Sequence, residues 1–326
     1  MKLLKKLGAI LICFALLTTS ACGTGETAVS NMFASQYWLA NTESDVGEIN
    51  ETSVYAVSFV EAEAKEGETK LTSTLNGTLT TNIQTSSYEG QQCYKFTTSL
   101  TTTGTYTYGD KSEQINDTIT STVYFLGIST KFFPLYSEKT VNTIAPSKNN
   151  GIEFIPVAYT VSTKYDKAGN SATVKVTSNL PDDAKHKIEN SERTYDKLTK
   201  GAPYLDNESL IFIPRASDLQ EGFSASFRTI DALSQKIHNM NLAVSSSSST
   251  VEIKLNSYTV DGVAANSTFN CYSATISISG TFSGAAIKAY YSADAKTHGK
   301  RLVKMENDLA FSLGKIVYTL QSVTHA

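Results

Sequence analysis

A hydrophobic period of two residues, repeated along most of the chain, constrains the fold more than any other feature. Between residues 71 and 83, odd-numbered positions hold the apolar Leu71, Leu75, Leu79 and Ile83, while threonine and asparagine fill the even-numbered positions. Successive side chains of a β-strand point to opposite faces, so this spacing gathers the apolar residues on one face. The segment is predicted to be a long strand with one buried face and one face in water.

Further strands with the same period follow along the chain, with turn residues between them. They include residues 55–59, 94–100, 119–125, 157–165 and 251–255. Glu89-Gly90, Gly109-Asp110 and Asp261-Gly262 are typical turn pairs. This regular punctuation, together with abundant threonine, tyrosine and valine, predicts a mainly β protein, an antiparallel meander of curled sheets with little helix.

The N-terminus carries the features of a targeting segment. Three of the first six residues are lysine, and the apolar run Leu7–Leu17 that follows is too short to span a bilayer comfortably. With Thr19-Ser20-Ala21-Cys22, this segment resembles the signal peptide and lipobox of a bacterial lipoprotein. The resemblance implies that residues 1–21 are removed and that Cys22 receives the lipid. A lipobox usually carries leucine where this chain has Thr19, so plain secretion after the same cleavage is the alternative.

The expected location follows from this segment. We expect lipidation, because an unmodified Cys22 would be an exposed reactive thiol. Residues 22–45 then form the lipid anchor and tether of an extracytoplasmic protein held at the bacterial cell membrane. No later segment is long and apolar enough to cross a bilayer. Loss of the three lysines would change the formal net charge from −3 to about −6, which argues against nucleic acid as a partner.

The composition divides the remaining chain into two parts. Residues 181–203 are charged and lack the two-residue period, so we predict a linker between a first β unit, 46–180, and a second, 204–326. Similar patterns after Cys93-Tyr94 and Cys271-Tyr272 are compatible with two related units. Chance matches in a chain rich in serine and threonine are the alternative.

The stretch after the linker breaks the strand pattern. Asp206–Arg215 is expected to form a short helix capped by Asp206 or Asn207 and stopped by Pro214. A buried strand over Leu210–Ile213 is the alternative, because periodicity alone does not separate the two.

The second unit also resembles a secreted bacterial domain of unknown function. The residues that carry the resemblance are Asp206-x-x-Ser209-Leu210 with Arg215, Ala289-Tyr290-Tyr291-Ser292, Leu302-Val303-Lys304-Met305 and the hairpin Leu309–Leu320. The resemblance implies a sheet that curls into an unclosed β-barrel. It carries over no activity, because that domain family has none established.

Catalytic and metal-binding patterns are absent from the sequence. The four histidines are scattered, and no zinc spacing, nucleophile elbow, phosphate loop or dinucleotide fingerprint occurs. Cys93 and Cys271 are predicted to be unpaired buried residues, with a disulfide as the alternative. We therefore predict no catalytic residue, no metal ligand and no cofactor, and expect that the protein is not an enzyme.

The predicted function is a non-catalytic binding or scaffold protein for an apolar or extended ligand, such as a lipid, peptide or glycan. The 17 tyrosines suit a recognition surface. The alternative is an extracytoplasmic hydrolase acting on cell-envelope polymers. A continuous apolar groove would favour binding, and a compact pocket with two or more carboxylates would favour hydrolysis. Six residues are predicted to face inward: Leu71, Leu75, Leu79, Val251, Ile253 and Leu255. Four are predicted to face water: Thr72, Thr74, Glu252 and Lys254.

Overall fold

The structure is a computed structural model. It describes residues 49–63, 68–128, 131–148, 152–166, 170–198, 204–217, 219–245, 250–278, 286–294, 300–309 and 312–326. The predicted signal peptide, Cys22 and the tether lie outside the described residues, so the lipidation of Cys22 stays a prediction.

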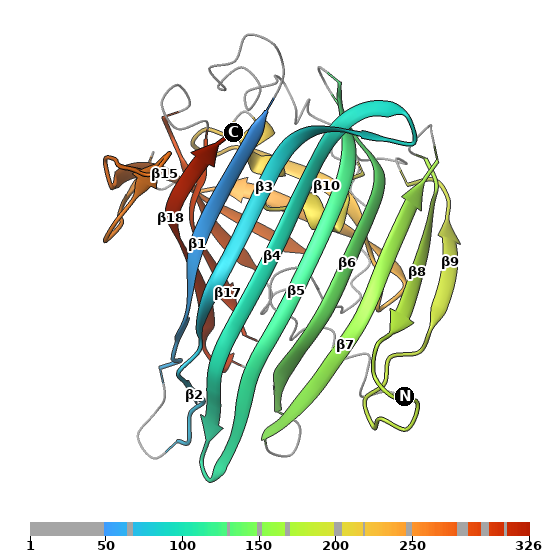
Figure 1. The fold of residues 1–326 in the computed structure, drawn as a ribbon, viewed down its shortest axis with the longest axis vertical. Coiled ribbons are helices and arrows are strands. Elements are labelled where there is room, and N and C mark those ends of the chain that lie inside the picture. Colours follow the sequence, from blue (N-terminus) through green and yellow to red (C-terminus); the bar gives the residue numbers. More distant parts are fainter. Residues whose placement is uncertain are drawn as a thin grey trace.

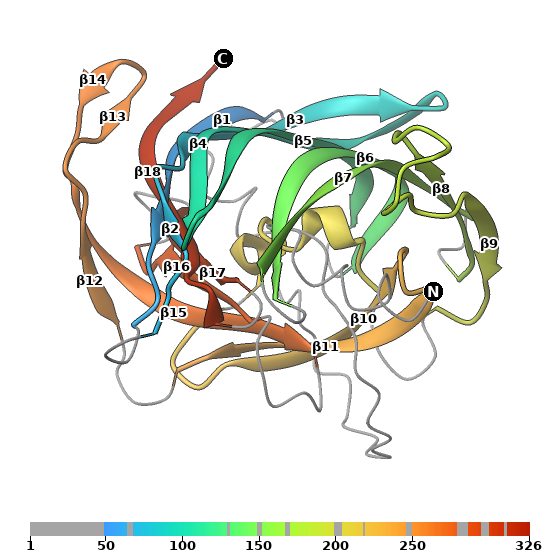
Figure 2. The ribbon, with the colours of Figure 1, turned by 90° about the horizontal axis from the view of Figure 1, so that it is seen from below.

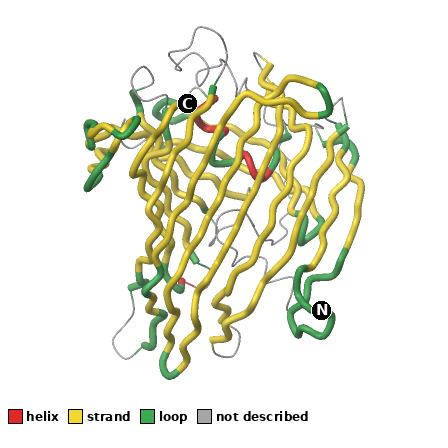
Figure 3. The backbone as a smooth tube through the Cα atoms, in the orientation of Figure 1, coloured by secondary structure: helices red, strands yellow, loops and turns green. Residues whose placement is uncertain are grey.

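In the described part of the chain, eighteen strands form one sheet. The first nine are β1 Asn50–Val60, β2 Thr72–Ser73, β3 Asn76–Tyr88, β4 Gln91–Tyr108, β5 Lys111–Ile128, β6 Lys131–Lys148, β7 Ile152–Tyr165, β8 Ala172–Ser178 and β9 Ser191–Tyr195. The other nine are β10 Ser224–Asp231, β11 Lys236–Val244, β12 Val251–Lys254, β13 Thr259–Val260, β14 Val263–Ala264, β15 Thr268–Ile278, β16 Ile287–Ser292, β17 Leu302–Asp308 and β18 Lys315–His325. Figure 3 shows how strand dominates the described chain.

The order of the strands explains how the sheet curls. Strands β3 to β9 form an antiparallel meander in which each strand pairs with the next. Strand β1 pairs with β3 on one side and with β18 on the other. From β18 the sheet continues through β17, β16, β15, β11 and β10. Figures 1 and 2 show this sheet wrapping around an interior.

The sheet does not close into a barrel. Within the described residues, β9 and β10 are the two ends of the strand order, and contacts other than a ladder join β10 to the chain that follows β9. The Arg228 guanidinium of β10 donates to the carbonyl oxygens of Lys197 at 2.8 Å and Leu198 at 3.0 Å. The Leu205 amide donates to the Arg228 carbonyl at 2.9 Å. The prediction of a mainly antiparallel β fold with an unclosed barrel is confirmed.

The segment after Tyr204 enters the interior of the curled sheet, where Figure 2 shows its two short helices. They are the 3-10 turns η2 Asn207–Ser209 and η3 Ile213–Ala216, and the Asp206 side chain caps η2. The cap at Asp206 is therefore confirmed, and Leu210–Ile213 is not the alternative strand, but two 3-10 turns stand where one short helix was predicted. The predicted stop is also wrong, because Pro214 lies near the start of η3 instead of ending a helix. A proline fits the first turn, where the backbone N–H has no helical partner.

Aromatic packing and one hydrogen bond hold this segment against the inner face of the sheet. The Phe212 ring lies 5.1 Å from the Phe96 ring and 5.9 Å from the Phe125 ring, measured between centroids. The Tyr291 hydroxyl donates to the carbonyl oxygen of Ile211 at 2.8 Å. A segment of the predicted second β unit thus packs inside the curled sheet, against strands of the predicted first unit.

Most of the predicted inward residues are buried, with one clear exception. Leu71, Leu75, Leu79 and Leu255 are buried, and Ile253 is half-buried. Val251 is 36% exposed, so its prediction is wrong. The strand β12 pairs only with the Thr268–Cys271 end of β15, whereas β11 pairs farther along that strand, from Ala274 to Ile278. Strand β12 therefore lies at the edge of the sheet, at the edge of the view in Figure 2, where Val251 is exposed although Ile253 still packs against the core.

Of the four predicted outward residues, Thr74, Glu252 and Lys254 are exposed and Thr72 is half-buried. The sheet passes through both predicted β units, and β9 lies within the predicted linker. The division into units stays a prediction. Cys93 on β4 and Cys271 on β15 are buried, unpaired thiols. Among the residues that the structure describes, no helix is long and apolar enough to cross a membrane.

Candidate functional site

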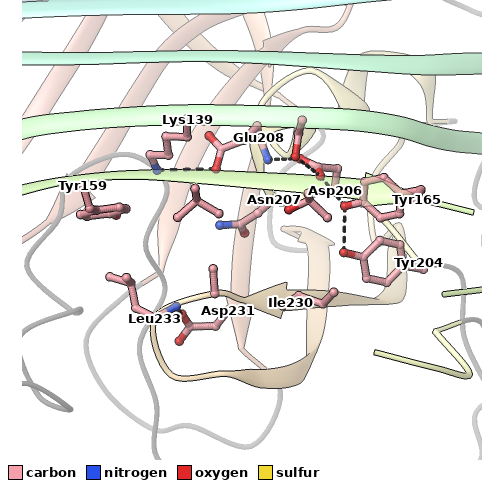
Figure 4. Close-up of a pocket in the computed structure, with 14 residues that line it drawn as sticks. Lys139, Tyr159, Tyr165, Tyr204, Asp206, Asn207, Glu208, Ile230, Asp231 and Leu233 are labelled. Atoms are coloured by element: carbon pink, nitrogen blue, oxygen red, sulfur yellow. Dashed lines mark hydrogen bonds and ion pairs between the residues drawn. The ribbon is translucent and has the colours of Figure 1, made fainter. Parts of the chain in front are cut away.

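A pocket lies where β6 and β7 face the end of β10 and the segment around η2. It contains about 490 Å³ of open space, partly continuous with solvent. Its enclosed part has room for only a few water-sized molecules. The lining residues are Ser137, Lys139, Tyr159, Val161, Thr163, Tyr165, Tyr204, Asp206, Asn207, Glu208, Ile230, Asp231, Ala232 and Leu233. Figure 4 shows the pocket.

Asp206 organises one side of the pocket. Its Oδ2 accepts hydrogen bonds from the Ser137 hydroxyl at 2.6 Å and from the Tyr165 hydroxyl. Its Oδ1 accepts from the backbone N–H of Glu208 at 2.8 Å. Burial raises the pKa of this carboxyl, and the hydrogen-bond donors oppose that shift. Because both oxygens have partners, Asp206 fixes the segment against β6 and β7.

Glu208 follows on the same turn and is 6% exposed. Its Oε1 lies 3.7 Å from the Nζ of buried Lys139 on β6. Its Oε2 is buried without a hydrogen-bond partner. Burial raises the pKa of Glu208 to about 7, while the nearby Lys139 charge lowers it. One carboxylate oxygen therefore remains available in the pocket.

Asp231 ends β10 and is 8% exposed. Its Oδ1 accepts from the backbone N–H groups of Leu233 at 3.1 Å and Ser234 at 3.2 Å, which shapes the turn into β11. Its Oδ2 has no hydrogen-bond partner and lies 3.8 Å from the Nε2 of His238. Burial raises the pKa of Asp231 and lowers the pKa of His238.

Glu208 on η2 and Asp231 at the end of β10 each bring one buried acceptor oxygen without a hydrogen-bond partner to the pocket, and Figure 4 shows them on opposite sides of it. An unsatisfied buried polar group is unfavourable, so a bound donor would be stabilised here. Burial, and then the charges of Glu208 and Asp231, raise the pKa of Tyr159 well above its ordinary range, so its hydroxyl stays protonated. Among the described residues, no group of three His, Cys, Asp or Glu side chains is placed to hold a metal ion.

A second buried charged cluster lies away from this pocket. The Arg215 guanidinium of η3 donates to both carboxylate oxygens of Glu51 on β1, at 2.7 and 3.3 Å. Arg301 donates to Glu51 Oε2 at 3.2 and 3.3 Å. Burial alone would raise the pKa of Glu51, but the charge of Arg215, a hydrogen bond with His325 and the charge of Arg301 hold it well below the ordinary value. Since every carboxylate oxygen here has a partner, this cluster is structural.

The sequence did not predict this pocket. Asp206 and Asn207, the two alternative helix caps, both line it, but Glu208 and Asp231 were not singled out. They line one pocket because the end of β10 approaches the segment around η2, and no short motif records that approach. Cys93 and Cys271 do not line the pocket, and Cys22 lies outside the described residues.

Comparisons with known proteins give little further information. No protein-family model matches the chain, and no curated protein matches it. A solved structure that it resembles is the beta-barrel-like protein of domain of unknown function DUF1849 from Brucella abortus. The two are 11% identical, with a TM-score of 0.47, and the match covers 85% of this chain and 98% of the other. The pocket has therefore to be interpreted from its own geometry.

Proposed function

We propose that this protein is a bacterial lipoprotein, anchored outside the cytoplasm by lipid on Cys22, that binds a ligand without transforming it. The observation that carries the binding proposal is the pair of buried carboxylate oxygens without partners, Glu208 Oε2 and Asp231 Oδ2. Such oxygens favour a ligand whose polar end donates hydrogen bonds. Peptides, glycans and the headgroups of some lipids carry such donors.

The packing supports a polar end to the ligand over a wholly apolar ligand. Phe212 and its neighbours in the segment after Tyr204 occupy interior space that an acyl chain would need. The pocket that remains beside Asp206 carries charged and hydroxyl groups among its apolar ones. An extended ligand could therefore enter with its donor end first and leave the rest of its length outside.

A hydrolase acting on envelope polymers is the second candidate, and one specific observation favours it. The pKa of Glu208 is raised to about 7, close to the value that suits a general acid at neutral pH. Asp206, two residues away, lines the same pocket. Against this role, both carboxylate oxygens of Asp206 already accept hydrogen bonds, from Ser137, Tyr165 and the Glu208 amide, which suits positioning better than catalysis.

The anchor is tested by metabolic labelling of bacteria with an alkyne fatty acid. Wild-type protein should carry the label and the Cys22→Ser variant should not. Equal labelling of both proteins would refute the anchor and leave plain secretion.

The binding site is tested with full-length protein purified in detergent and mixed with a soluble fraction of digested bacterial envelopes. Native mass spectrometry should detect an adduct on wild type that is lost in Ala232→Phe, because the new ring fills the pocket. Ala264→Phe, on exposed β14 outside the pocket, is the matched control and should keep the adduct. An adduct unaffected by Ala232→Phe, or no adduct on wild type, would refute binding in this pocket. Steady release of fragments from undigested polymer, abolished by Glu208→Gln, would favour the hydrolase.

A further inference from the structure

We infer that the hairpin tip after β13, residues 261–266, inserts shallowly into the surface of the membrane that carries the protein. This inference rests on the proposed lipid anchor at Cys22. It goes beyond the anchor, because it names the face of the protein that meets the lipid. The exposure, charge and position of the tip each support it.

The tip carries the most exposed large apolar side chain in the described part of the chain. Val263 is 70% exposed, whereas the two other exposed side chains of this kind, Val60 and Val251, are 41% and 36% exposed. Ala264 and Ala265, which follow Val263, are also exposed. A single exposed valine is ordinary on a protein surface, but three apolar residues in a row at a hairpin tip form a small patch. Contact with lipid would remove this patch from water.

The charges of the tip do not oppose contact with lipid. Asp261 is the only charged residue in it, and β18 engages its carboxylate. The backbone N–H of His325 donates to Asp261 Oδ1 at 2.7 Å, and the His325 Nδ1 lies 3.1 Å from Asp261 Oδ2. Other hairpin tips of the sheet carry exposed charges, such as Glu89 between β3 and β4 and Asp110 and Lys111 between β4 and β5.

The tip lies where the body of the protein joins the segment that leads to the proposed anchor. Asp261 contacts His325, and His325 is the cross-strand partner of Glu51 near the start of β1. Figure 2 shows β13 and β14 on the outside of the sheet, beside β18. The segment Cys22–Glu48 has 27 residues, and a flexible linker of that length spans about 30 Å on average. A lipid on Cys22 therefore keeps the tip within reach of the bilayer.

The size of the patch fits a contact that assists an anchor. One valine and two alanines bury little apolar surface, so the tip alone would hold the protein only weakly on a membrane. A tether changes this balance, because it raises the effective concentration of the tip at the bilayer to the millimolar range. A weak contact is then populated for much of the time.

A second copy of the chain is a less suitable occupant for the tip. Strand β14 contains two residues, Val263 and Ala264, so a ladder with a partner strand would provide few hydrogen bonds. A lipid surface needs no matching strand and only requires that the exposed side chains be apolar.

Tryptophan fluorescence in vesicles tests the inference on the full-length, lipidated protein. The chain has one tryptophan, Trp38, which is replaced by phenylalanine so that Val263→Trp reports alone. The vesicles contain equal amounts of phosphatidylcholine and phosphatidylglycerol, with or without brominated acyl chains that quench a nearby indole. Brominated lipid should lower the emission of Val263→Trp by about twofold or more, because the tip then lies at the boundary between headgroups and acyl chains.

Val60→Trp is the matched control, because Val60 is also exposed but ends β1. That strand has 11 residues, which places Val60 about 33 Å from its start. The emission of Val60→Trp should change by less than about a tenth, since a tip inserts only into the outer part of a bilayer. Thermal melting checks that both variants fold. Equal quenching of the two variants would overturn the inference.

Flotation of the vesicles separates this inference from the proposed anchor. If wild-type protein does not float with the vesicles, the anchor fails and the inference fails with it. If the protein floats but the indole of Val263→Trp is not quenched, the inference alone fails. Emission that shifts to shorter wavelength as more protein is added, without quenching by brominated lipid, would assign the tip to a second copy and also overturn the inference.

Discussion

Glu51 and Arg215 stand 164 positions apart in the chain and form a buried, two-point ion pair. The pair links β1, in the middle of the sheet, to η3, inside it. Arg301 bonds the same carboxylate from the start of β17. One carboxylate thus joins three parts of the chain, which ties the interior segment to the wall that surrounds it.

Replacing Arg215 by methionine should be strongly destabilising. The substitution keeps much of the side-chain length but removes one of the two guanidinium groups that bond the buried Glu51. Breaking a buried pair from one side typically costs about 3–5 kcal/mol. Urea denaturation should show a loss of that order for Arg215→Met. Lys70→Met, which breaks the exposed pair with Glu61, is the control and should cost less than about 1 kcal/mol. Similar losses in both variants would contradict the role of the buried pair.

Gly77 should be intolerant of a side chain, because β3 approaches β4 too closely there. A Cβ atom at this position would lie 2.1 Å from the carbonyl oxygen of Thr101 and 2.8 Å from the Cα of Thr102. These are backbone atoms, so the strands themselves would have to separate. Gly77→Ala should lower the free energy of unfolding by about 3 kcal/mol or more.

Gly90 provides the matched control for Gly77. It has a positive φ of 80° but nothing within 4 Å of a Cβ, so Gly90→Ala should cost only about 1 kcal/mol of backbone strain. Comparing the denaturant midpoints of the two variants separates the cost of the steric clash at Gly77 from the cost of backbone strain at Gly90. A smaller loss in Gly77→Ala than in Gly90→Ala would show that the strands have room to move apart.

The sequence was informative where local physics decides the structure. The alternation of apolar and polar residues around Leu79 predicted strand β3 of the sheet, and the polar side chain of Asp206 predicted the cap of η2. The same alternation was misleading at Val251, because the period says which residues share a face but not how far along the strand that face meets the core, which here reaches Ile253 but not Val251. The pocket was not foreseeable for a related reason. Glu208 and Asp231 come to line one pocket through the curl of the whole sheet, which depends on the sum of many strand twists.

Cys93 and Cys271 should react only after unfolding. Both thiols are buried, and burial raises their pKa, that of Cys271 to about 12. Because the thiolate is the reactive form, alkylation of the native protein should be slow. Denaturation without a reducing agent should then expose two alkylatable thiols, counted by mass spectrometry. An unreduced mass two hydrogens lighter, with neither thiol modified, would instead demonstrate a disulfide.

Asp117 should make folding less favourable as the pH rises. It lies on β5 and is 3% exposed, and burial raises its pKa to about 6 from an ordinary value near 3.8. Its Oδ1 accepts from the Ile144 amide at 2.9 Å, which opposes the shift only in part. The folded state therefore holds the proton more tightly than the unfolded state. The stabilisation is fully present below pH 4 and is lost as the pH rises through 6.

The difference between wild type and Asp117→Asn isolates this effect, because asparagine keeps the acceptor oxygen and does not titrate. Between pH 4 and pH 8 the wild type should lose roughly 3 kcal/mol relative to the variant, the equivalent of a shift of about two pKa units. Glu51 contributes with the opposite sign, since its folded pKa is lowered, but its stabilisation is lost only at acidic pH and is common to both proteins. Urea denaturation across this range provides the measurement. Parallel stability curves for the two proteins would mean that Asp117 titrates alike in the folded and unfolded states.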